Sequence, residues 1–122
     1  MGGHIHEAIN DFRYQHGIST VAWCEDLEQD CYYHTQYMLY NNKCSHAPAH
    51  LLNGVHFECV GCEWRTHYLG DWDSIRSLIF TVLGNSPIHK QHILDAVVIS
   101  GSYLFDIDEY QANTYICLRG YK

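Results

Sequence analysis

The sequence is poor in basic residues, in proline and in long apolar runs. Seven Lys and Arg residues stand against 14 Asp and Glu residues, which gives a net charge of −7 with His neutral. Such a surface repels a phosphate backbone, so we expect no nucleic-acid partner. Two prolines and nine glycines exclude a collagen-like or low-complexity chain. The longest candidate run, Leu78 to Leu83, is far shorter than the roughly 20 residues that span a bilayer, which excludes a transmembrane segment.

What the chain has instead is the composition of a folded protein. Hydrophobic residues make up 47% and charged residues 17% of its 122 residues, so we expect one domain over residues 1–122 with its own core. Ten His residues and the acidic balance favour metal ions or cationic partners. The first residues show neither the basic leader nor the apolar segment of a signal peptide. Both an intracellular or viral chain and a trimmed secreted chain fit this start.

Hydrophobic periodicity predicts helices first and a strand pair last. Apolar residues recur at helical spacing in four segments, the third with Asp71 or Asp73 as N-cap and Gly84 as C-cap. The predicted helices cover Ile5 to His16, about Glu25 to Tyr40, about Trp72 to Val82, and a short segment opened by Ser86-Pro87. The predicted strands, rich in Val, Ile and Tyr, cover Ala96 to Phe105 and Thr114 to Arg119. Helices followed by a hairpin indicate an α+β layered fold.

Residues 43–70 show no sustained periodicity in their apolar residues. A compact domain rarely keeps so long an irregular stretch unless it is functional or held by crosslinks. The stretch is rich in residues that carry chemistry, among them Cys44, His46, Glu58, Cys59 and Cys62. We therefore expect a functional site here.

Four segments of the chain carry recognisable motifs. They are residues 9–17, Ile-Asn-Asp-Phe-Arg-Tyr-Gln-His-Gly; Val21-Ala22-Trp23; Tyr37-Met38 through Ser45-His46; and residues 86–94, Ser-Pro-Ile-His-Lys-Gln-His-Ile-Leu. In this order they resemble the opening motif, the next segment, the end of the second helix and the "S-P-x-H-R-x-N-I-L" motif of the CAP superfamily, also called the SCP or pathogenesis-related-1 family, in its bacterial-type variant. The resemblance implies a three-layer α-β-α sandwich and an extracellular location.

The resemblance also implies a cleft in which His46 and His89 face each other with Glu58 beside them. Family members bind a divalent metal, often zinc, through the two His residues, and several bind lipids. The chain departs from the family in two places. Phe57-Glu58-Cys59-Val60 replaces "G-E-N-I", and His92 stands where Asn is typical. The second acidic residue of the family site could be Glu63, Asp71 or Asp73.

The chemistry of the three residues fits a metal role. Two neutral imidazoles and a carboxylate oxygen suit zinc and leave a position open for water. His89 lies near a predicted helix N-terminus, where the positive end of the helix dipole disfavours imidazolium. Glu58 could bind the metal directly or orient an imidazole ligand through a hydrogen bond.

The six cysteines divide into two groups. Cys24 and Cys31 lie on the apolar stripe of the second helix and Cys117 on the last strand, so we expect buried free thiols. The second group is Cys44, Cys59 and Cys62, for which three states are possible. The three thiolates could form a zinc site completed by His46, Cys44 could form a disulfide with Cys59 or Cys62, or all three could be free thiols.

Three functions follow from these observations. The first is a binding module with a metal-competent His pair and a lipid-like, glycan or protein ligand. The second is a hydrolase, either with a zinc-bound water at His46 and His89 activated by Glu58, or with Cys59 or Cys44 as nucleophile beside one of these His residues. The third is a structural domain whose Cys-rich loop is held by zinc.

Overall fold

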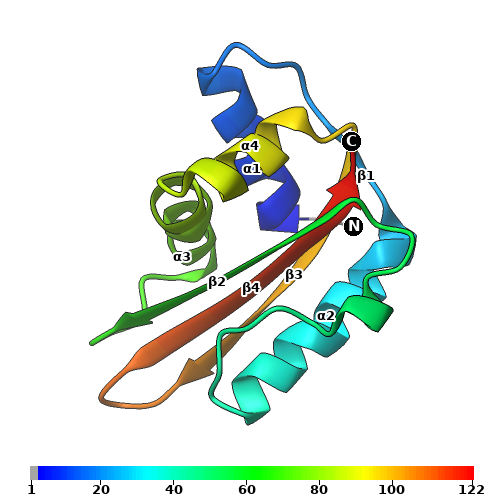
Figure 1. Cartoon of the computed structure of the whole chain (residues 1–122). Helices are drawn as coiled ribbons and strands as arrows, with labels where there is room; N and C mark the ends of the chain where they lie inside the picture. Colours follow the sequence, from blue (N-terminus) through cyan, green and yellow to red (C-terminus); the bar gives the residue numbers. More distant parts are fainter. Residues whose placement is uncertain (1–2) are drawn as a thin grey trace.

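A four-stranded sheet lies between two helical layers in the computed structural model, which describes residues 3–122 (Figure 1). Helices α1, α3 and α4 cover one face of the sheet and α2 covers the other. This arrangement confirms the predicted α+β sandwich. In chain order the elements are α1 (Gly3–Gln15), β1 (Ala22–Trp23), α2 (Glu25–Tyr40), the 3₁₀ turn η1 (Ala49–Leu51), β2 (Phe57–Arg65), α3 (Asp71–Ser77), the π-helical turn η2 (Leu78–Leu83), α4 (Pro87–Asp95), β3 (Val98–Ile107) and β4 (Ala112–Tyr121).

The strand order is β1-β3-β4-β2, with β1 parallel to β3 and the other pairs antiparallel. The C-terminal hairpin of β3 and β4 is therefore confirmed and forms the centre of the sheet. Side chains that alternate along β2 and β4 point to opposite faces, and this alternation decides which residues meet on the α2 side.

The helices form because their apolar residues repeat every three or four positions and are buried on one side. Ile5, Ala8, Ile9 and Phe12 of α1 pack into the larger core, between the sheet and the layer of α1, α3 and α4. Cys31 and Met38 of α2 pack with residues of β2 and β4 in a smaller core on the other face. Gly17 follows α1 with φ 74°, a conformation that glycine adopts easily.

Three expectations about local structure were wrong. Residues 43–70 are not irregular throughout, because β2 occupies Phe57–Arg65 and hydrogen-bonds to β4 along its whole length. Gly70, and neither Asp71 nor Asp73, is the N-cap of α3. The third helix is not α-helical throughout, because it changes at Leu78 into the π-helical turn η2; its predicted C-cap, Gly84, is confirmed.

Candidate functional site

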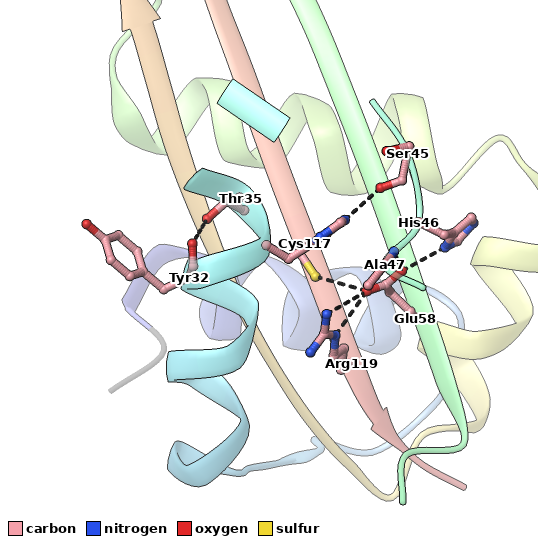
Figure 2. A network of polar contacts seen from close by, with 9 residues as sticks. Tyr32, Thr35, Ser45, His46, Ala47, Glu58, Cys117 and Arg119 are labelled. Carbon is pink, nitrogen blue, oxygen red and sulfur yellow. Dashed lines mark hydrogen bonds and ion pairs between the residues drawn. The ribbon is translucent and has the colours of Figure 1, made fainter. Parts of the chain in front are cut away.

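Glu58 is the centre of a buried polar network on the α2 side of the sheet (Figure 2). The register of β2 and β4 places it directly opposite Arg119, whose Nε and Nη2 lie 3.0 and 2.9 Å from Glu58 Oε2. The backbone N–H of Ala47 donates to Oε1 at 3.0 Å, and His46 Nδ1 lies 2.9 Å from the same oxygen. The Cys117 thiol donates to Oε2 at 3.7 Å. Both oxygens of this carboxylate are thus engaged by protein groups.

The network keeps Glu58 ionised although its side chain is only 1% exposed. Burial acts to raise the pKa of Glu58, but the hydrogen bonds from Ala47 and His46 and the charge of Arg119 outweigh it, and the pKa is lowered. An ionised, fully engaged carboxylate is suited to orienting its neighbours. It is poorly suited to accepting a proton from a substrate or a water molecule.

His46 lies on the exposed segment between α2 and β2, with a side chain that is 56% exposed. Its Nδ1 is the donor to Glu58, because an ionised carboxylate can only accept. In the neutral ring this tautomer leaves the lone pair of Nε2 free. The segment is held on both sides of the ring, by the Ala47 bond to Glu58 and by His34 Nε2, which lies 2.6 Å from the carbonyl oxygen of Ser45.

His89 is the third residue of α4, which begins after the N-cap Ser86 with Pro87 in its first turn, as predicted. The pKa of His89 is lowered, first by burial and second by the nearby His46. This direction agrees with the neutral ring expected from the sequence, but its causes are burial and His46, whereas the expectation rested on the helix dipole. The effect of His46 also places the two imidazoles within electrostatic range of each other.

Arg13 of α1 fixes the far end of α4. Its Nε donates to the carbonyl oxygen of Ser19 at 2.7 Å. Its Nη1 donates to three carbonyl oxygens at the C-terminus of α4 and just beyond, those of Ile93, Leu94 and Ala96 at 2.8–3.1 Å. These carbonyls have no partners within the helix, and a cation is favourable at this end of the helix dipole. The Arg of the opening motif thus positions the helix that carries His89.

The imidazoles are the donor groups that this site could offer to a metal ion. His46 and His89 offer imidazole nitrogens of the kind that zinc prefers. Glu58 does not complete a third position, since its oxygens hold Arg119, Ala47 and His46. Across residues 3–122, no group of three or more His, Cys, Asp or Glu side chains is arranged to hold a metal ion. The donor chemistry therefore allows at most a two-imidazole site, whose remaining ligands would come from water or from a bound molecule.

The cysteines do not form the thiolate site that the sequence left open. Cys44 and Cys62 form a disulfide, with Cα atoms 6.0 Å apart. The Cys-x-x-Cys unit lies on β2, where residues three apart face opposite sides, so Cys59 points into the larger core while Cys62 packs against the smaller one. Cys31 and Cys117 are buried free thiols as expected, whereas Cys24 is half-buried at the N-cap of α2.

The same geometry removes both cysteine nucleophiles. Cys44 has no free thiol because it is bonded to Cys62. Burial, with a smaller contribution from Glu58, raises the pKa of Cys59 to about 12. Nucleophilic cysteines need a lowered pKa and access to substrate, and Cys59 has neither.

An open cavity of about 730 Å³ lies beside this network, between α2 and the segment 43–51. Tyr33, His34 and Tyr37 of α2 form one wall, and Arg119 of β4 contributes to the lining. The rest of the lining comes from Asp30 of α2 and from six residues of the segment 43–51: Lys43, Ser45, His46, Pro48, His50 and Leu51. The volume is within the range of small-molecule sites. Of the two imidazoles proposed from the sequence, His46 lines the cavity and His89 does not.

Sequence reasoning missed Arg119 and this cavity. A signal for Arg119 existed, because it continues the alternating set of Tyr115 and Cys117 on a face that is otherwise buried, and a charge there needs a partner. Tyr33 and Tyr37 are four positions apart on α2 and so lie on one side of the helix. Their role as a cavity wall depends on where the segment 43–51 lies, which no local pattern shows.

The family assignment rests on a match of residues 6–96 to the model of the CAP, or cysteine-rich secretory protein, family. The match covers most of the chain, and the protein belongs to this family. None of the helices in residues 3–122 combines the length and apolar character needed to cross a bilayer. Among curated protein sequences no match is found.

Two solved structures share the fold. An outer surface protein from Borrelia burgdorferi superposes with a TM-score of 0.66 and 15% identity, over 97% of this chain and 90% of that one. An extracellular protein containing an SCP domain from Bacillus anthracis str. Ames superposes with a TM-score of 0.61 and 15% identity, over 97% of this chain and 39% of that one.

Proposed function

We propose that this chain is a ligand-binding module of the CAP family whose cleft can hold a divalent metal ion, zinc by its donor chemistry, on His46 and His89. The observation that carries the proposal is the hydrogen bond from His46 Nδ1 to Glu58. A metal-binding His commonly donates its other ring nitrogen to a carboxylate, which sets the tautomer and the direction of the free lone pair.

Each residue has a defined part in this proposal. Glu58 orients His46, and the hydrogen bonds from Ala47 and His46, together with the charge of Arg119, keep Glu58 ionised. The lowered pKa of His89 favours the neutral form of that ring at physiological pH. A bound zinc ion would supply a Lewis-acid centre with positions open to a ligand atom. Two protein ligands also predict weaker binding than in a structural zinc site with four.

Binding is favoured over hydrolysis because the network offers no free general base. Glu58 is the candidate base beside the His pair, and its two oxygens already accept from Arg119, Ala47, His46 and Cys117. A carboxylate with a lowered pKa and no free lone pair is a poor acceptor for a substrate proton. We place the module outside the cell, since disulfides persist in oxidising compartments and both solved relatives bear the names of surface or extracellular proteins.

The proposal is tested by titrating the chelator-treated protein with Zn²⁺ in a calorimeter. We expect one site, weakened at least tenfold in His46→Ala and in His89→Ala. His67→Ala is the matched control, because His67 is also exposed and lies away from the pair on the loop before α3. Absence of binding, or equal binding by all four proteins, would contradict the proposal.

A further inference from the structure

The cavity between α2 and the segment 43–51 has two chemically different parts. Its α2 wall is aromatic, formed by Tyr33, His34 and Tyr37. Its lining also includes the guanidinium of Arg119, whose side chain is 5% exposed. We propose that this cavity binds a small aromatic carboxylate, with the ring against the α2 wall and the carboxylate at Arg119.

The aromatic wall favours a flat ligand. The rings of His34 and Tyr37 are nearly parallel, with an interplanar angle of 13° and centroids 5.9 Å apart. The bond between His34 Nε2 and the Ser45 carbonyl holds the first ring in place, and Tyr37 is 49% exposed beside it. Pro48 and Leu51 lie among the lining residues of the other wall. A flat aromatic ring gains offset-stacked contacts in such a site, whereas a flexible alkyl chain does not.

Arg119 favours an anionic group in the cavity. Its Nε and Nη2 both donate to one oxygen of Glu58. We place Nη1, which takes part in neither bond, toward the cavity. A carboxylate can accept two parallel N–H bonds from the edge formed by Nη1 and Nη2. Glu58 also accepts hydrogen bonds from His46 and Ala47, so its oxygens do not occupy the Nη1 side of the guanidinium.

The other charges near the cavity are mixed in sign. Glu58, the ion-pair partner of Arg119, is negative and is not one of the lining residues. Lys43 and Asp30, of opposite sign, belong to the lining, and both are exposed. Ser45, His46 and His50 add hydrogen-bonding groups. An uncharged glycan would offer the Nη1 side of the guanidinium only neutral acceptors, whereas a carboxylate offers it a charged one, which is why a carboxylate is preferred.

This inference rests on the proposed binding function and does not rest on the metal. His46 lines the cavity, whereas His89 does not belong to its lining. His89→Ala should therefore weaken zinc binding at least tenfold and leave ligand binding in the cavity unchanged. The two proposals can fail separately.

The probes are 2-naphthoate, its neutral analogue 2-naphthylmethanol, and decanoate, each titrated into the metal-free protein by calorimetry. We expect 2-naphthoate to bind with a sub-millimolar Kd and each of the other two to bind at least tenfold more weakly. Equal binding of the neutral analogue would overturn the role of Arg119. Binding of decanoate alone would overturn the aromatic class while leaving the proposed binding function in place, and absence of all binding would overturn the inference.

Variants locate the site. Tyr37→Ala should weaken 2-naphthoate binding at least fivefold. Tyr40→Ala is the matched control, because Tyr40 is on the same helix, is 77% exposed and is not part of the lining. Both positions are exposed, so the fold should survive, and the amide NMR spectrum verifies this. An equal loss in both variants, or no loss in Tyr37→Ala, would refute the location.

Discussion

The most direct test of the network is to neutralise Glu58 while keeping its shape. Glu58→Gln preserves an oxygen that can accept from Ala47, but it removes the charge opposite Arg119. The guanidinium, with a side chain only 5% exposed, then remains buried without a counter-ion. We expect the variant to fold with a clearly reduced free energy of unfolding.

The magnitude follows from burial. Removing one partner of a buried ion pair costs about 3–5 kcal/mol, whereas an exposed pair contributes about 0–1 kcal/mol. Asp11 and Arg76 provide the exposed comparison within the same chain, with side chains 48% and 35% exposed and a separation of 3.0 Å. Glu58→Gln should therefore cost several times more than Asp11→Asn.

Urea unfolding followed by tyrosine and tryptophan fluorescence measures both values. The double variant Glu58→Gln/Arg119→Met removes both charges and should recover most of the lost stability, because an apolar replacement of a buried pair is often nearly neutral. A cost below about 1 kcal/mol for Glu58→Gln, or a double variant as unstable as the sum of the two single variants, would refute the reasoning.

The pH dependence of this effect has a definite sign. The pKa of Glu58 in the folded protein is lowered from its ordinary value of 4.5, so the folded state holds this proton less tightly than the unfolded state. The stabilisation is complete above pH 4.5 and is lost as the pH falls through the lowered folded value. The difference in stability between wild type and Glu58→Gln should shrink on going from pH 7 to strongly acidic solution. A difference that stays constant would contradict the role of the charge.

Three further predictions concern other parts of the fold. Reducing the Cys44–Cys62 disulfide, which joins residues 18 apart, should lower stability by about 3 kcal/mol in urea unfolding, whereas a Cys44→Ser variant should not respond to reductant. The pKa of His92 is lowered, mainly by burial, so His92→Asn should lose less stability than wild type as the pH falls from 6.5 to about 5 in thermal unfolding. A Cβ on Gly120 would lie 2.8 Å from the Phe57 ring and closer still to backbone, so Gly120→Ala should lower the Tm by several degrees; an unchanged Tm would contradict this packing.

The amphipathic helices and the last two strands could be predicted because their burial is periodic. β2 could not, because Phe57 to Gly61 are all buried and the strand therefore lacks the alternation that identifies a half-buried strand. Because residues 57–65 were expected to be irregular, Cys59 and Cys62 could be expected to bind one zinc ion together. On a strand they face different cores, and this leaves Cys62 to pair with Cys44.

The site could be predicted in part. The family motifs point to His46, Glu58 and His89, and the structure brings the first two into contact and the third within electrostatic range. Arg119 could not be assigned to Glu58 from the sequence, because they are 61 positions apart and meet only through the register of β2 and β4. Long-range pairing of this kind depends on the whole sheet.

The central claim is that His46 and His89 form a metal-competent pair, and imidazole NMR tests it most directly. Long-range ¹H–¹⁵N spectra of the metal-free protein should show neutral His46 protonated at Nδ1, as the bond to Glu58 requires. One equivalent of Zn²⁺ should then shift the free nitrogens of His46 and His89 together. A His46 ring protonated at Nε2, or zinc shifts confined to other His rings, would contradict the account.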